Sequence, residues 1–330
     1  MIRAYELTKR YGDTTVVQDL DFTVRPGTVT GFLGPNGAGK STTMRMLLGL
    51  DAPTRGSSTI GGRAYASHSA PLTEVGALLE ARSVHPGRTA FHHLMSLAHT
   101  HGIPRSRVEH VLDLVGLTAV AGKRIKGFSL GMGQRLGIAS ALLGDPAVLI
   151  LDEPVNGLDP EGVLWIRNLL RSLAAEGRTV LVSSHLMSEM ALTADHLVII
   201  GRGRLLADTT VDDFVATAGG ASVRVLTPQA PALRDLLQGP GIDITGPTTS
   251  PTGTEARELT NSTRPTAADP GELQVRGADA AHIGRVAAAH AIPLYELTPR
   301  TASLEQAFMD LTHESVDYRI TAPEPTGALA

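Results

Sequence analysis

The sequence contains no cysteine, few aromatic residues and no long apolar run. None of its 330 residues is Cys, and Phe, Trp and Tyr together make up 4%. The lack of cysteine excludes disulfides and zinc–thiolate sites, and it is compatible with the cytosol. The longest apolar candidate, residues 136–151, is broken by Asp145-Pro146. Because a spanning helix needs about 20 consecutive apolar residues, no membrane span is expected.

Charge of one sign is not in large excess either. The formal net charge is −4 and the pI is about 6.3. Neither value indicates binding to nucleic acid or to an anionic membrane surface. The chain begins Met1-Ile2-Arg3 without a basic stretch and an apolar segment behind it, so a signal peptide is not expected. Any work at a membrane would need a partner that supplies the spans.

The sequence does contain a glycine-rich stretch that fits G-x-x-x-x-G-K-[ST] at every position. An apolar, strand-like run (29–33) precedes it, and a helix-like run (42–50) follows it. This order aims backbone N–H groups and the positive end of a helix dipole at one point, which suits a phosphate. Lys40 would reach the β- and γ-phosphates, and the Ser41 hydroxyl would bind Mg²⁺. The stretch consists of Gly34, Pro35, Asn36, Gly37, Ala38, Gly39, Lys40 and Ser41.

Two adjacent carboxylates follow an unbroken apolar run. The run covers residues 147–151 and closes on Asp152-Glu153. Such a run is typical of a central parallel strand that is buried on both faces, and ligands bind at the carboxyl ends of these strands. Burying two carboxylates for structure alone would be costly. We therefore expect Asp152 to hold Mg²⁺ and Glu153 to orient or deprotonate the attacking water.

Ser129 stands at a second helix start, because a helix-like run follows it as far as Leu143. Serine is a good N-cap, so one interpretation is only a capped helix. The other is a second anion-binding helix N-terminus, where Gly131 allows a phosphate to approach closely.

The sequence alone leaves the roles of three further residues open. His185 follows the strand-like run 178–183 and is a candidate γ-phosphate sensor, since imidazole can donate to a phosphate oxygen, although a lone histidine is more often structural. Tyr11 could stack on an adenine or cover a sheet edge. Glu80 closes another strand-like run that begins at Val75.

Between these motifs the apolar spacing predicts two amphipathic helices, around Phe91–Ala98 and Val108–Val115. This segment is rich in histidine, but adjacent histidines on a helix point about 100° apart. No Cys or paired carboxylate completes a metal-ligand set. We interpret these histidines as solvated helix surface. Further on, residues 156–160 read as a turn and Trp165–Leu173 as a helix.

Taken together, residues 1–215 resemble one ATP-binding cassette of the ABC ATPase family. The similarity is greatest to ATP-binding subunits of bacterial drug and antibiotic exporters of the daunorubicin-resistance type. The resemblance implies an α/β, P-loop NTPase cassette with a core mixed sheet, an N-terminal antiparallel β part and a helical insertion at about 85–145. It also implies the cofactors ATP and Mg²⁺.

The resemblance assigns roles to single residues. Tyr11 resembles the adenine-stacking aromatic residue, and Glu153 the catalytic glutamate, with Lys40 and His185 completing the catalytic set. Asp152 resembles the Walker B aspartate, and Ser41, Asp152 and Glu80 are the implied metal ligands. The remaining nucleotide contacts implied are the Walker A loop 34–41 with Thr42, the signature residues Ser129 and Gly131, and the D-loop residue Asp159.

Two positions depart from the family pattern. The signature reads Ser-Leu-Gly-Met, so Leu130 and Met132 replace a glycine and the glutamine. The position of the Q-loop glutamine is Glu80, which adds negative charge near the phosphates.

The resemblance also implies partners. Two copies would close head-to-tail over two ATP molecules, each site combining one Walker A loop with the other copy's signature. The pair would drive a separate multi-spanning membrane permease from the cytoplasmic face of the cell membrane, exporting drugs, antibiotics or other hydrophobic compounds. The alternative is a soluble ABC ATPase that acts on nucleic acid or ribosomes. Soluble ABC ATPases of that class usually carry a second cassette, zinc motifs or basic patches, and the sequence shows none of these. We therefore expect no nucleic-acid partner.

The C-terminal third reads as a small α+β accessory domain at 216–316. Its order is strand, helix, strand, strand, helix, strand, which is typical of a ferredoxin-like domain; the last strand is expected at 294–297. Residues 247–270, rich in Thr, Pro, Ser and Glu, are expected to form a flexible loop, and 317–330 a disordered tail. Dimer stabilisation or regulation is the role we expect of this domain.

Overall fold

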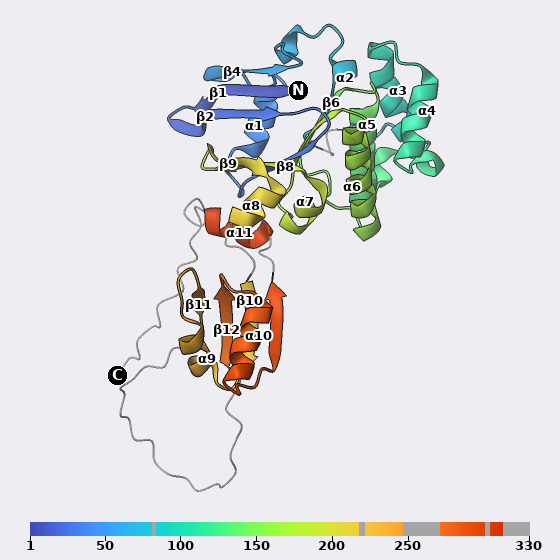
Figure 1. Cartoon of the computed structure of the whole chain (residues 1–330). Coiled ribbons are helices and arrows are strands. Elements are labelled where there is room, and N and C mark those ends of the chain that lie inside the picture. Colours follow the sequence, from blue (N-terminus) through green and yellow to red (C-terminus); the bar gives the residue numbers. More distant parts are fainter. Residues whose placement is uncertain (81–83, 218–221, 247–270, 301–303, 313–330) are drawn as a thin grey trace, which may run out of the picture. The chain divides into compact units, whose positions relative to one another are not determined.

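The computed structural model describes residues 1–80, 84–217, 222–246, 271–300 and 304–312 (Figure 1). The chain forms two compact units. The first contains Met1–Val211 and the chain from Phe308 on, which includes the end of helix α11 (Leu304–Thr312), and the second contains Asp212–Ala307. Across these described ranges, no helix has both the length and the apolar character needed to cross a bilayer.

The first unit contains a three-stranded antiparallel sheet of order β2-β1-β4. Alternate side chains such as Leu20, Phe22 and Val24 are buried on one face of it, as expected for a half-buried strand. The expected N-terminal antiparallel part is therefore present. Its strands are β1 (Ile2–Tyr11), β2 (Thr14–Val24) and β4 (Arg55–Ile60).

A mixed six-stranded sheet forms the centre of the first unit, with order β5-β6-β7-β3-β8-β9. The first five strands are parallel and β9 is antiparallel. Strands β6, β7 and β3 are buried along their whole length, because the antiparallel sheet packs with helix α1 (Lys40–Leu47) on one face and helices cover the other. Since these three strands are neighbours, the residues that follow each of them meet at one edge. The strands are β3 (Val29–Leu33), β5 (Val75–Leu78), β6 (Val148–Leu151), β7 (Thr179–Ser183), β8 (His196–Gly201) and β9 (Arg204–Thr210).

Helices pack on this sheet. The helices of the helical insertion are α3, α4 and α5 (Figure 1). The expected helix at Trp165 begins five residues earlier, because Asp159 caps it and Pro160 suits its first position. The interpretation of His93 as solvated surface is wrong: only 9% of it is exposed, because it faces α5. The helices of this unit are α1 (Lys40–Leu47), α2 (Pro71–Glu74), α3 (Ala90–Thr100), α4 (Arg105–Leu114), α5 (Leu130–Leu142), α6 (Pro160–Ala175) and α7 (Met187–Thr193), with 3-10 turns at Tyr65–Ser67, Thr118–Val120 and Ile125–Gly127. Helix α8 (Val211–Thr217) belongs to the second unit from its second residue on.

The second unit contains an antiparallel sheet of order β11-β12-β10-β13. Its helices α9 and α10 share one apolar core with the sheet. The element order is the one expected, but the last strand begins at Glu296 rather than at Leu294. The loop expected at 247–270 and the tail expected at 317–330 lie outside the described residues. The elements are β10 (Ser222–Thr227), α9 (Ala230–Leu237), β11 (Asp243–Thr245), β12 (Gly271–Arg276), α10 (Ala280–Ala289) and β13 (Glu296–Arg300).

Candidate active site

The glycine-rich stretch forms a loop between strand β3 and helix α1. Gly37 and Gly39 have φ values of 82° and 100°, which favour glycine. A Cβ on Gly39 would also lie 2.9 Å from the carbonyl oxygen of Val16. A pocket of about 300 Å³ opens above this loop. Its lining residues are Val16, Pro35, Asn36, Gly37, Ala38, Gly39, Lys40, Ser41, Thr42, Asp152 and Glu153.

Lys40 is the first residue of α1, and its side chain bends back over the loop. Its Nζ donates to the carbonyl oxygens of Gly34 at 2.6 Å and Pro35 at 3.2 Å. Burial lowers the pKa of Lys40, and the carboxylates of Glu153 and Asp152 act in the opposite direction. The ammonium group is thus held beside the pocket, where an anionic phosphate would compensate its desolvation.

Asp152 follows β6, and both of its carboxylate oxygens accept hydrogen bonds. Ser41 Oγ donates to Oδ2 at 2.6 Å, and Ser183 Oγ donates to Oδ1. A carboxylate and a serine hydroxyl side by side are hard oxygen donors, which Mg²⁺ prefers. The structure therefore brings Ser41 and Asp152 together as the sequence predicted, and it adds Ser183 at the end of β7.

Glu153 and His185 lie against each other at the same edge of the sheet. His185 Nδ1 lies 2.7 Å from Glu153 Oε2, and the His185 backbone N–H donates to the same oxygen at 3.3 Å. The His185 side chain is half exposed, and that of Glu153 is 21% exposed. The two groups are close enough to exchange a proton, and Glu153 also lines the phosphate pocket.

Ser129 lies at a different hollow, of about 460 Å³. Its hydroxyl caps α5 by accepting from the backbone N–H of Met132 at 3.2 Å. Asp159 caps α6 in the same way, because its carboxylate oxygen Oδ1 accepts from the backbone N–H of Gly162 at 2.9 Å. The hollow shares no lining residue with the phosphate pocket. It is lined by Ser129, Leu130, Gly131, Met132, Arg135, Gly157, Leu158 and Asp159.

Tyr11 and Glu80 do not line the phosphate pocket either. The Tyr11 hydroxyl donates to Asp51 at 3.1 Å, and Lys9 Nζ lies 4.8 Å from the centre of its half-exposed ring. Glu80 follows β5 and lines a groove of about 440 Å³ whose other walls include Arg45 and His93.

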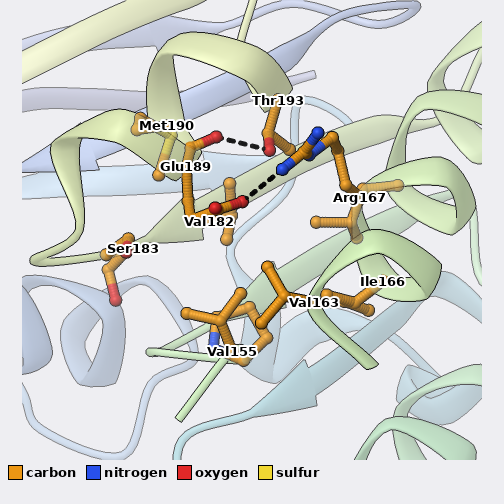
Figure 2. A pocket seen from close by; sticks show the side chains of 12 residues that line it. Val155, Val163, Ile166, Arg167, Val182, Ser183, Glu189, Met190 and Thr193 are labelled. Carbon is orange, nitrogen blue, oxygen red and sulfur yellow. Dashed lines mark hydrogen bonds and ion pairs between the residues drawn. The ribbon is translucent and has the colours of Figure 1, made fainter. Parts of the chain in front are cut away.

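A small cavity of about 20 Å³ lies directly behind the Glu153–His185 pair, between β7, α6 and α7. Its walls include the residues that follow Glu153 and those that precede His185. Figure 2 shows Arg167 of α6 reaching Glu189 of α7 beside it, with Nη2 2.6 Å from Oε2. Helices α6 and α7 are therefore fixed to each other next to the site.

Four residues that contribute to the site's geometry carry no motif of their own in the sequence. They act through the tertiary structure, by holding other residues rather than by facing the pocket. The only hints in the sequence are that Ser183 precedes His185 and that Gln134 follows the Ser129 motif. The four are Gln134, Arg167, Ser183 and Glu189.

Comparisons with known proteins show the family of the chain. A family model described as ABC transporter matches residues 17–156, and one described as an AAA domain matches 124–191. A domain of unknown function matches residues 221–305. The bacitracin transport ATP-binding protein BcrA of Bacillus licheniformis is 44% identical over 215 residues, which cover 64% of this chain and 70% of the relative.

The lantibiotic transport ATP-binding protein SrtF of Streptococcus pyogenes is 36% identical over 212 residues, 64% of this chain and 92% of the relative. Among solved structures, a dimeric bacterial ABC transporter cassette superposes with a TM-score of 0.59 at 23% identity, covering 64% of this chain and 99% of that one. These relatives give no support to the alternative of an ATPase that acts on nucleic acid or ribosomes. The chain belongs to the ATP-binding proteins of ABC transporters, and it is an ATP-binding ATPase of that family.

Proposed function

We propose that this chain powers an exporter of antibiotics or similar hydrophobic compounds through a separate membrane permease. The observation that carries the proposal is the 44% identity to a bacitracin transport ATP-binding protein over 215 residues. The lantibiotic transport relative supports the same class of cargo. The pocket supports the source of energy, because Lys40, Ser41 and Asp152 converge where a triphosphate would lie.

Within the pocket, each residue has a distinct task. Lys40 and the loop N–H groups bind and orient the β- and γ-phosphates. Ser41 and Asp152 would hold Mg²⁺, which would help to neutralise the charge of the phosphates. Glu153 would accept a proton from the attacking water, and His185 would hold the carboxylate and contact the γ-phosphate. Tyr11, which does not line the pocket, would stack on the adenine outside it.

Two copies of the chain would complete each site. Ser129 and Gly131 line a hollow separate from the pocket of Lys40, so within one chain they do not serve the same nucleotide. A capped helix N-terminus suits an anion. We propose that this N-terminus and Asp159 serve the nucleotide of a second copy, as the dimeric form of the structural neighbour suggests.

The permease would dock at the groove beside Glu80. This groove combines apolar walls, such as Leu50 and Leu97, with the charged Arg45 and Glu80. A short amphipathic helix from a cytoplasmic loop of the permease fits such a groove. The chain would then act at the cytoplasmic face of the membrane.

Co-expression with the membrane protein encoded beside this chain tests the proposal. We expect the two proteins to co-purify, and a charge reversal at Arg45 in the groove to weaken that complex. Lys123→Glu, at an exposed site outside the groove, is the matched control. Recovery of the chain without any membrane protein, together with unchanged antibiotic tolerance of cells expressing both, would argue against an exporter.

A further inference from the structure

Glu153 has a backbone conformation that residues other than glycine adopt rarely. Its φ is 50°, in the left-handed region. Both of its backbone polar groups are held by side chains from other elements. Its N–H donates to Ser183 Oγ at 2.9 Å, and its carbonyl accepts from Gln134 Nε2 at 3.1 Å. The carbonyl also accepts from the backbone N–H of Asn156 at 3.2 Å within the turn. The two side-chain hydrogen bonds attach this turn to β7 and α5, and the direction of the Glu153 carboxylate depends on the turn.

Gln134 connects this turn to the helix that begins at Ser129. It lies in the second turn of α5 and is only 4% exposed. Because water does not reach the amide, a hydrogen bond removed there is not replaced. The helix whose N-terminus carries Ser129 is therefore bonded to the backbone of Glu153 in the same chain.

A second contact joins the same two segments. We call residues 153–159 the catalytic loop. The side chain of Leu130 lies on the face of Gly157 in this loop: a Cβ on Gly157 would be 2.3 Å from Leu130 Cδ2. A Cβ on Gly131 would be 2.9 Å from the Gly157 carbonyl oxygen. The leucine that departs from the family's glycine thus packs against the loop with part of its side chain, while 48% of the residue stays exposed.

We propose that Gln134 and Leu130 are positioning residues that fasten the first two turns of α5 to the catalytic loop. A nucleotide of a second copy that binds at Ser129 then acts on the Glu153 backbone of the chain that supplies Ser129. Each copy senses its neighbour's nucleotide and adjusts its own hydrolysis. This inference rests on the proposed two-copy site. Gln134 lines neither the phosphate pocket nor the hollow at Ser129, so it acts through other residues. Leu130 lines the hollow and also packs on Gly157.

Gln134→Met removes the amide donor and keeps the length of the side chain. We expect kcat for ATP to fall about tenfold or more while KM for ATP stays near that of the wild type, because the phosphate loop is untouched. Gln274→Met, which removes a glutamine hydrogen bond to Ser222 in the second unit, is the matched control and keeps both constants. A wild-type kcat, or an equal loss of ATP affinity, overturns the proposal.

Gln134→Asn provides a second variant in case the methionine is not tolerated. It retains a polar amide but is one methylene too short to reach the Glu153 carbonyl. The same selective loss of kcat is expected. A kcat equal to that of the wild type would overturn the role of this hydrogen bond.

Gly157→Ala tests the contact with Leu130 through a double-mutant cycle. We expect it to lower kcat several-fold in the wild type and by less in a Leu130→Gly background, where the clash is absent and only the backbone strain at a φ of 75° remains. Gly177→Ala is the matched control, since Gly177 has a φ of 92° and nothing within 4 Å of its Cβ position. An equal loss in both backgrounds would overturn the role of Leu130.

Ser129→Arg separates failure of this inference from failure of the proposed function. If Ser129→Arg abolishes hydrolysis while Gln134→Met hydrolyses ATP normally, the proposed site between two copies is supported. The proposed role of Gln134 in positioning the catalytic loop is then wrong. If Ser129→Arg hydrolyses ATP normally, the two-copy site is wrong, and with it the communication between copies.

Discussion

At the scale of single residues, the site depends on side chains whose charges are held in place by backbone groups and hydroxyls. Lys40 is bonded to the carbonyl oxygens of Gly34 and Pro35, and Asp152 to the hydroxyls of Ser41 and Ser183. These hydrogen bonds set the positions of the groups that would bind phosphate and its metal ion.

Replacement of Lys40 tests this arrangement most directly. We expect Lys40→Ala to weaken ATP binding about a hundredfold, because the variant lacks the charge-assisted hydrogen bond from the ammonium group to the phosphates. Titration with a fluorescent ATP analogue measures the change. Lys123→Ala, at an exposed lysine of the helical insertion, is the control. Near-normal turnover by Lys40→Ala would contradict the phosphate assignment.

His93 makes stability dependent on pH. Burial, with a smaller contribution from the charge of Arg88, lowers the pKa of His93 below its usual value. The unfolded chain therefore binds more protons than the folded chain in mildly acidic solution. As pH falls through about 6.5 toward the lower folded pKa, the free energy of unfolding should decrease. The same groove also holds Glu80 and Arg45.

Urea unfolding between about pH 7.5 and 5.5 measures this dependence. His93→Gln should show a shallower decrease than the wild type, because glutamine does not titrate. His99→Gln, at an exposed position of the same helix, is the control. Equal slopes for His93→Gln and the wild type would mean that His93 contributes nothing to the pH dependence.

At the scale of elements, helix starts organise the site. Helix α1 begins at Lys40, α5 behind the Ser129 cap and α6 behind the Asp159 cap. The Ser129 and Asp159 caps lie at one hollow. A side-chain cap is required there whether or not a nucleotide binds, so each residue has a structural as well as a functional reason to be present.

Replacement of the Asp159 cap should lower stability by about 1 kcal/mol, because the backbone N–H of Gly162 loses its acceptor. Denaturant unfolding of Asp159→Ala measures this loss. Asp279→Ala removes an equivalent cap from α10, where Asp279 accepts from His282 at 2.6 Å. It should destabilise the second unit instead. An unchanged midpoint for Asp159→Ala would mean that water replaces the cap without cost.

At the scale of the whole molecule, the proposed function includes a second copy, because Lys40 and Ser129 lie at separate hollows of one chain. Glu153→Gln should bind ATP but hydrolyse it slowly, because the amide cannot accept a proton from water. Two copies should then remain closed over the nucleotide, and size-exclusion chromatography with ATP should show a dimer. The double variant with Lys40→Ala is the control, since it lacks the phosphate contact. A Glu153→Gln chain that stays monomeric with ATP would contradict the proposed closure of two copies over the nucleotide.

The local motifs could be predicted from the sequence because they depend on short-range physics. A glycine-rich loop between an apolar run and a helix has few conformations, and an apolar run that ends in Asp152-Glu153 indicates the carboxyl end of a buried strand. These rules predicted the phosphate loop, its partner Asp152 and the Ser129 cap. They also predicted the element order of the second unit.

Only the tertiary structure decided which distant residues meet. The adjacency of β6 and β7 brings Ser183 to Asp152 and His185 to Glu153, and the packing of α5 brings Gln134 to the Glu153 carbonyl. The burial of His93 was decided in the same way. A hydrogen bond between residues far apart in sequence leaves no local pattern, because each partner alone suits many environments. The sequence determines the chemical groups of the phosphate loop and of the Asp152-Glu153 pair. The positions of Ser183, His185 and Gln134 beside them follow from strand order and helix packing.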